Sequence, residues 1–274
     1  MKSLRKRIAC LAVTAAACLL TSCSGGPDAG VLVREAASEA AALNSCTAVV
    51  TNTLVFTANG ASHSFESTNR LSYHANPFAV KSVQSSRNDG MSGNSETYTV
   101  AEDSGIGFYC KSSSGWKKTD AGKLDTSPAA QITPLQMLRS VDDQKYVRQT
   151  ELNSVPVHKI ELKLKNEVLR STVENIVTAS GMGNGSKTIV QALLDSAPPI
   201  YGYCYLSVGS GRPARLELNA ADAVNRIFSG IDGSSVKISV SKCTVTCDLS
   251  GLDSTPAAKL PDEAKSASSV EAAG

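Results

Sequence analysis

Most of the chain alternates between apolar and polar residues with a period of two, which is the spacing of β-strands with one drier face. In residues 46–57 the even positions hold most of the apolar side chains, from Ala48 to Phe56. In residues 155–164 His158 and the following apolar residues alternate with charged ones. About ten or eleven strands are predicted in this way. They fall in 46–57, 65–74, 78–83, 98–100, 106–110, a short strand at Trp116 after the turn 112–115, 146–152, 155–164, 200–208, 215–218 and 236–247.

Tight turns separate these strands. Asn59-Gly60 lies between two alternating segments, and both residues tolerate the positive φ that a hairpin turn needs. Residues 88–95 are rich in Gly, Asn and Asp and predict another turn. The apolar parity slips near Ser241-Lys242, which predicts a β-bulge. Short strands joined in this way favour an antiparallel sheet.

A period near 3.6 residues replaces the period of two in a few segments and predicts helices among the strands. No internal repeat of fixed period is visible, so strands and helices are expected to form one α+β domain. The predicted helices are 31–43, 134–140, 166–180, 187–194 and 220–228.

The N-terminus has the pattern of an exported lipoprotein. A cationic start is followed by an apolar run, residues 8–20, which is shorter than the ~20 residues that cross a bilayer as a helix. Leu20-Thr21-Ser22-Cys23 resembles the bacterial lipobox, in which the cysteine is acylated, with palmitate expected here. The domain is then anchored to the extracytoplasmic face of the cell membrane. The expected organisation is signal peptide 1–22, flexible tether 23–30, folded domain 31–264 and disordered tail 265–274.

The charge balance argues against nucleic acid as a partner. Four of the 27 basic residues lie in the signal, which leaves 23 against 25 acidic residues in the mature chain. After the signal, the sequence contains no run of basic residues that could contact successive phosphates of a nucleic acid. Three histidines, none near the Cys243/Cys247 pair, make a metal site less favoured than disulfides, and no cofactor is predicted.

Cysteines of an exported chain usually form disulfides. Cys243 and Cys247 on one extended strand are ~13 Å apart, beyond the ~7 Å that a disulfide allows between Cα atoms. Each is therefore expected to bond elsewhere, with Cys204 as the preferred partner of one of them and Cys46–Cys110 as a weaker pair. The mature domain has five cysteines: Cys46, Cys110, Cys204, Cys243 and Cys247.

No residue is predicted to be catalytic. His158 lies on the apolar parity of its strand, which favours a hydrogen-bonded core or rim histidine, and no Gly-x-Ser-x-Gly motif occurs. Residues 181–185 follow a predicted helix, so a loop is favoured over a phosphate site. Asp142-Asp143 could supply paired carboxylates for acid–base chemistry. Adjacent side chains on an extended segment point to opposite sides, so a solvated turn is favoured instead.

Several short motifs occur in an order that resembles the LolA/LolB and LppX/LprG-like superfamily of exported lipoproteins, including uncharacterised Gram-positive members. The resemblance covers roughly residues 30–264. It implies a curved antiparallel half-barrel sheet with helices on its concave face, which in several members holds acyl chains. The chain departs from the family in having five mature cysteines and few large aromatic residues. The motifs are Gly115-Trp116-Lys117-Lys118, residues 154–160 (SVPVHKI), residues 209–218 (GSGRPARLEL) and residues 257–264 (AAKLPDEA).

The predicted helix 166–180 has an apolar stripe with two interpretations. It covers the concave face as core, or it acts as a lid over a ligand cavity. The leading hypothesis is a non-enzymatic lipoprotein that binds a lipid or another amphipathic molecule. The alternative is an envelope interaction or structural module with a filled core and a protein or wall polymer as partner. The stripe consists of Val168, Leu169, Val173, Ile176 and Val177.

Overall fold

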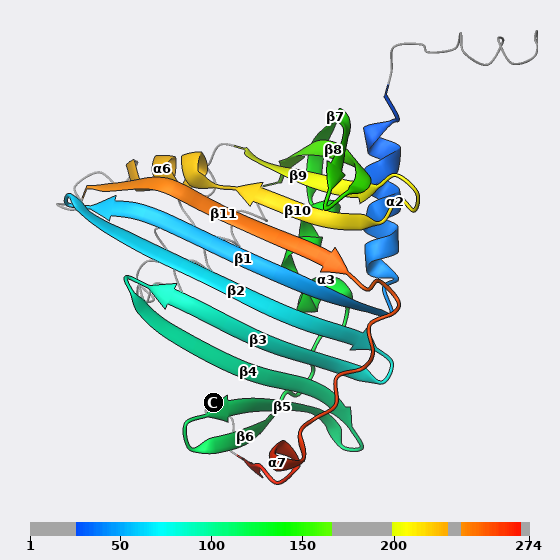
Figure 1. The fold of residues 1–274 in the computed structure, drawn as a ribbon, viewed down its shortest axis with the longest axis vertical. Helices are drawn as coiled ribbons and strands as arrows, with labels where there is room; N and C mark the ends of the chain where they lie inside the picture. Colours follow the sequence, from blue (N-terminus) through cyan, green and yellow to red (C-terminus); the bar gives the residue numbers. More distant parts are fainter. Residues whose placement is uncertain (1–25, 166–198, 230–236, 270–274) are drawn as a thin grey trace, which may run out of the picture.

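The computed structural model describes residues 26–165, 199–229 and 237–269. They form an open, curved 12-stranded sheet, a half-barrel of the predicted α+β class (Figure 1). The strand order is β12-β6-β5-β4-β3-β2-β1-β11-β10-β9-β8-β7, and only the β12–β6 pair is parallel. The strands are β1 (Ser45–Ala58), β2 (Ala61–Ala75), β3 (Phe78–Asn88), β4 (Met91–Glu102), β5 (Gly105–Ser112), β6 (Gly115–Asp120), β7 (Val141–Leu152), β8 (Val155–Leu164), β9 (Ile200–Ser207), β10 (Pro213–Asn219), β11 (Ile238–Ser250) and β12 (Ser268–Ser269).

Turn and bulge positions agree with the local sequence, with one correction. Asn59 and Gly60 have φ values of 51° and 84° and join β1 to β2, which confirms the hairpin. The predicted turn 88–95 is too long, because Asp89-Gly90 alone, with positive φ, joins β3 to β4. The bulge is confirmed: Ser241 has no partner in the register with β1 and donates its hydroxyl to the Val55 carbonyl at 3.2 Å.

Five helical elements accompany the sheet in the described residues. The first begins two residues earlier than predicted, because the Asp28 carboxylate accepts hydrogen bonds from the Gly30 and Val31 N–H groups and caps it. The predicted helix 134–140 is a 3₁₀ helix, and predicted helices 166–180 and 187–194 lie outside the described residues. The elements are α2 (Ala29–Ala41), α3 (Pro128–Gln131), η1 (Thr133–Arg139), α6 (Ala221–Ser229) and α7 (Asp262–Lys265).

The main core lies on the concave face of the sheet, defined here as the face against which α2, η1 and α6 pack. Val33 of α2, Leu135 of η1 and Val224 of α6 are buried in one cluster with strand residues such as Val50 and Leu216. Asn225 fixes α6 to β11, since its amide both donates to and accepts from the Val240 backbone. The helices therefore cover part of the concave face.

A second, smaller core lies on the opposite, convex face, under the C-terminal segment that follows β11. Figure 1 shows this segment running across the strands from β11 to α7 beside β6. Ala264 of α7 is fully buried against Tyr98 and Tyr109, with Trp116 packed beside them. Residues 265–269 end α7 and form β12, so the first half of the predicted disordered tail is ordered.

Candidate functional site: the concave face of the sheet

A buried row of apolar side chains crosses the concave face from β1 to β8. The register pairs Val50 with Cys247, Cys247 with Leu216, Leu216 with Cys204, and Cys204 with Ile160. All five residues are buried. Because paired residues on neighbouring strands point to the same face, the row is a continuous apolar floor.

Apolar side chains continue along the same face, toward the β1–β2 turn, and three of them are less completely buried than the floor. Phe56, Phe65 and Val245 are only partly buried and pack against the edge of the main core. Phe56 stacks on the His63 ring with 5.0 Å between ring centroids, and His63 Nδ1 lies 2.8 Å from an Asp89 carboxylate oxygen. This part of the concave face offers apolar contact area that the core does not fully use.

Polar side chains lie beside this apolar area on the same face. Asn52 donates to Ser67 at 3.2 Å, and Ser82 donates to Asn69 at 2.7 Å. Their register places these residues on the parity of Val50 and its partners. The concave face is therefore amphipathic, with an apolar part on β8–β11 and β1 and a polar strip on β1–β3.

The sequence analysis missed this polar strip. Asn52 is the polar exception among the even positions of β1, and Ser67 and Asn69 share the parity of Phe65 in β2. The signal was present in each strand separately. Only the register across three strands shows that the exceptions are neighbours.

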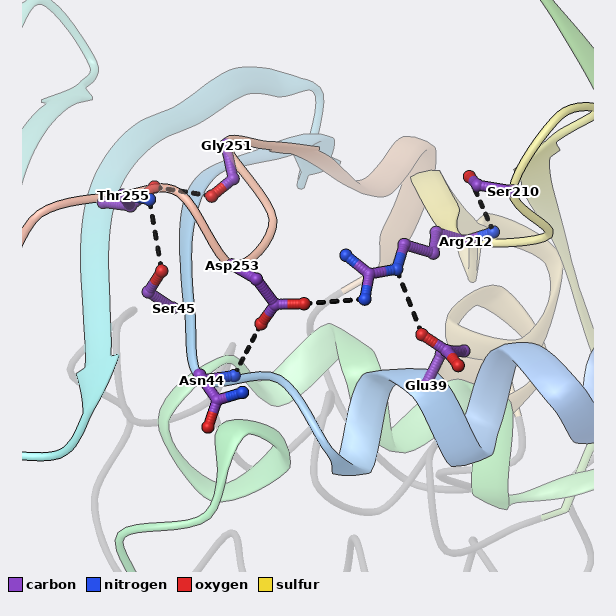
Figure 2. A network of polar contacts seen from close by, with 8 residues as sticks. All are labelled: Glu39, Asn44, Ser45, Ser210, Arg212, Gly251, Asp253 and Thr255. Atoms are coloured by element: carbon purple, nitrogen blue, oxygen red, sulfur yellow. Dashed lines mark hydrogen bonds and ion pairs between the residues drawn. The ribbon is translucent and has the colours of Figure 1, made fainter.

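A polar network fixes α2 to the loops at the end of the sheet (Figure 2). The Arg212 guanidinium lies 3.0 Å from a Glu39 carboxylate oxygen and 2.6 Å from one of Asp253. Asp253 also accepts from the Asn44 N–H at 2.8 Å, and Thr255 N–H donates to Ser45 Oγ at 3.1 Å. The N-terminal helix, the β9–β10 turn and the segment after β11 are therefore connected at one place.

The network predicts an acid-sensitive contribution to stability. The hydrogen bond from the Asn44 N–H, and then the Arg212 guanidinium, hold the pKa of Asp253 below its usual 3.8. A lowered pKa in the folded state stabilises above the unfolded-state pKa, and this stability is lost as the pH falls through the folded-state value. Asp253→Asn should therefore lose less unfolding free energy than the wild type between about pH 5 and about pH 2.

Denaturant unfolding at a series of pH values measures this difference. Asp103→Asn is the matched control, because Asp103 is exposed in a turn and has no hydrogen-bond or ion-pair partner among the described residues. The control should follow the wild type. An Asp253→Asn protein with the full wild-type acid loss would contradict the assignment.

Four buried thiols belong to the concave core. Burial raises the pKa of Cys46, Cys204 and Cys247 to about 12 and that of Cys243 to about 11. Such thiols stay protonated at neutral pH and are poor nucleophiles. They contribute as small apolar side chains.

All five described cysteines, including the less buried Cys110, are free thiols in this structure. Cys243 and Cys247 do lie four residues apart on β11, as expected. Leu216 of β10 lies between Cys204 and Cys247, which puts two strand spacings, ~9.6 Å, between them. Cys46 and Cys110 lie four strands apart, ~19 Å. Cys243 is farther still from Cys204, because it lies four residues from Cys247 along β11. These spacings exceed the ~7 Å limit, so neither the predicted pair of Cys204 with Cys243 or Cys247 nor Cys46–Cys110 fits this sheet order.

The other candidate residues have simple structural environments. His158 is half-buried, with its Nδ1 3.3 Å from the Tyr146 hydroxyl. Asp142-Asp143 belongs to β7, not to a turn, because the strand begins at Val141; Asp142 forms an ion pair with Lys163 at 2.6 Å. Cys23, residues 181–185 and the five stripe residues of 166–180 lie outside the described residues.

The described residues hold neither a candidate metal cluster nor a candidate membrane-spanning helix. No group of three or more His, Cys, Asp or Glu side chains that could hold a metal ion occurs within them. No helix among them is long and apolar enough to cross a bilayer.

No family model and no curated protein matches the sequence. LprF from Mycobacterium bovis is similar with a TM-score of 0.47 and 12% identity, over 87% of this chain and 98% of that chain. Lipoprotein LppX of Mycobacterium tuberculosis is similar with a TM-score of 0.41 and 10% identity, over 81% of this chain and 93% of that chain. A chain of the MucA/MucB complex of Pseudomonas aeruginosa is similar with a TM-score of 0.29 and 13% identity, over 83% of this chain and 58% of that chain. The function proposed for this chain therefore rests on its own sequence and geometry.

Proposed function

We propose that the chain is a membrane-anchored, extracytoplasmic lipoprotein that binds a lipid or another amphipathic molecule on the concave face of its half-barrel. The amphipathic character of that face is the observation that carries the proposal. Partly buried Phe56, Phe65 and Val245 supply apolar contacts, and the strip of Asn52, Ser67, Asn69 and Ser82 supplies hydrogen-bonding groups next to them.

Both parts of an amphipathic ligand find partners in this arrangement. Each methylene that leaves water for the apolar part contributes ~0.8 kcal/mol. A polar headgroup keeps its hydrogen bonds only if the protein replaces those it made to water, and the amide and hydroxyl groups of the strip can do so. The proposal assigns no reaction to the protein.

Val245→Thr should weaken lipid binding about tenfold, because a hydroxyl replaces a methyl group of the apolar part and its desolvation against an acyl chain costs ~1.4 kcal/mol. Threonine has nearly the shape of valine, so the fold should persist. Val55→Thr on the convex parity of the neighbouring β1 is the matched control, since Val55 is also half-buried. Its binding should stay at the wild-type level.

Native mass spectrometry after gentle extraction of the full-length protein measures the bound lipid. The wild type and Val55→Thr should carry lipid, and Val245→Thr should retain much less. A wild-type protein without lipid, or two variants with equal retention, would contradict the proposal. A stable protein partner cross-linked on intact cells, with no lipid bound, would favour the envelope interaction module instead.

A further inference from the structure

The folded part of the chain begins closer to Cys23 than the sequence predicts. Gly26 lies close to the Tyr146 ring of β7: a Cβ added to Gly26 would be 2.5 Å from Cδ1 and 2.6 Å from Cε1. Two residues later Asp28 caps α2, and Gly30 also approaches β7, since a Cβ added to it would be 3.0 Å from the Gln144 side-chain nitrogen. The N-terminal segment is therefore packed on β7 from Gly26 onward.

Chain length then limits the distance between β7 and an acylated Cys23. Gly26 is three residues after Cys23, and at ~3.6 Å per residue their Cα atoms can be at most ~11 Å apart. By contrast, β3 is seven strands from β7 in the sheet order, ~34 Å along the sheet at ~4.8 Å per strand. An anchor at Cys23 therefore holds one end of the sheet at the membrane surface.

The side chains around this attachment point suit an interface between water and lipid. Val31 in the first turn of α2 is 37% exposed, and Val147, next to Tyr146, is 43% exposed. Lys145 and Arg148 on β7 are exposed and have no ion-pair partner among the described residues. Aliphatic groups beside cationic side chains with long apolar stems are typical of surfaces that rest at the headgroup layer.

The edge position of β7 agrees with a surface contact and not with insertion. One side of β7 pairs with β8, and its other side has no partner strand in the described sheet. Unpaired backbone groups are satisfied by water or lipid headgroups but are costly in hydrocarbon.

We infer that the end of the molecule formed by Val31, Lys145, Val147 and Arg148, the α2–β7 end, rests on the lipid headgroup layer. This inference rests on the proposed acylation of Cys23. It goes further in assigning the domain a fixed orientation, with β7 at the membrane and β3 to β6 away from it. The concave face then begins at the bilayer, since Tyr146 lies on the same parity as Ile160.

Energy transfer from tryptophan to a labelled lipid tests the orientation. Trp116 on β6 is the only tryptophan in the chain and is first replaced by phenylalanine. Into this Trp116→Phe background, tryptophan is introduced by Val147→Trp or, as matched control, by Val83→Trp. Val83 is 40% exposed, similar to Val147, but lies on β3. Each full-length acylated protein is reconstituted into phosphatidylethanolamine/phosphatidylglycerol vesicles that contain dansyl-phosphatidylethanolamine.

Transfer should be several-fold stronger from the Val147→Trp protein than from the Val83→Trp protein. Flotation of the same vesicles shows separately whether each protein is anchored. Anchored proteins with equal transfer, or with stronger transfer from position 83, would overturn the orientation and leave the proposed anchor standing. Proteins that fail to float would overturn the anchor and the orientation together.

Discussion

Gly202→Ala is expected to lower the unfolding free energy by about 1–3 kcal/mol, a large effect for one added methyl group. A Cβ at this position in β9 would lie 2.6 Å from the Glu217 carbonyl oxygen of β10 and 2.7 Å from the Met137 Cε of η1. The methionine end can move, but the carbonyl belongs to the paired backbone of β10. The strands must therefore shift to accept the methyl group.

Gly209→Ala is the matched control for this prediction. No heavy atom lies within 4 Å of a Cβ at Gly209, and its φ is outside the left-handed region. Each kcal/mol lost should lower the Tm by about 2–4 °C for a domain of this size. Thermal unfolding of both variants measures the difference. Equal Tm values would mean that the Glu217 carbonyl of β10 does not approach Gly202 as closely as the structure shows.

The sequence predicted the elements whose signals are local. Asn59-Gly60 specifies a hairpin because both residues accept positive φ, whatever the rest of the chain does. The bulge at Ser241 was visible because a one-residue insertion reverses the apolar parity of a strand. Strand alternation also indicated which face of β1 and of β8 is buried.

Elements that depend on distant partners were not predicted. Residues 265–274 read as a disordered tail because they have few large apolar residues. The first half of this stretch is ordered because β12 pairs with β6, and because Ala267 packs with Ala264 against Tyr98 and Tyr109 on the convex face, more than 150 residues earlier in the chain. The start of β7 was missed for the same reason, since two exposed aspartates favour a turn locally, and only the pairing of Val141 and Asp143 with β8 makes this stretch a strand.

The site and the cysteine environments depend on strand order, which alternation alone does not give. β11 inserts between β1 and β10, so Cys247 has Val50 and Leu216 as its cross-strand neighbours. A proposed Cys204–Cys247 bridge would have to pass over Leu216. The polar strip likewise arises only when β2 sets Ser67 opposite Asn52 and β3 sets Ser82 near Asn69.

Cys23→Ser is expected to abolish both fatty acylation and stable membrane attachment. The resemblance to the lipobox implies that the Cys23 thiol accepts the lipid, and a serine hydroxyl does not replace the thiol in this reaction. Each methylene buried in the bilayer contributes ~0.8 kcal/mol, so one palmitoyl chain contributes on the order of 10 kcal/mol. The apolar run 8–20 is too short to cross a bilayer in its place, since a spanning helix needs ~20 residues.

Incorporation of an alkynyl palmitate analogue, followed by alkaline extraction of membranes, measures both effects in cells. Cys110→Ser is the matched control, because Cys110 is the one described cysteine that is not buried and is the most accessible alternative acceptor. This control should keep the label and stay in the membrane fraction, whereas Cys23→Ser should lose the label and be extracted. Persistent labelling of Cys23→Ser, or its loss from Cys110→Ser, would place the lipid elsewhere and remove the basis for an α2–β7 end held at the membrane.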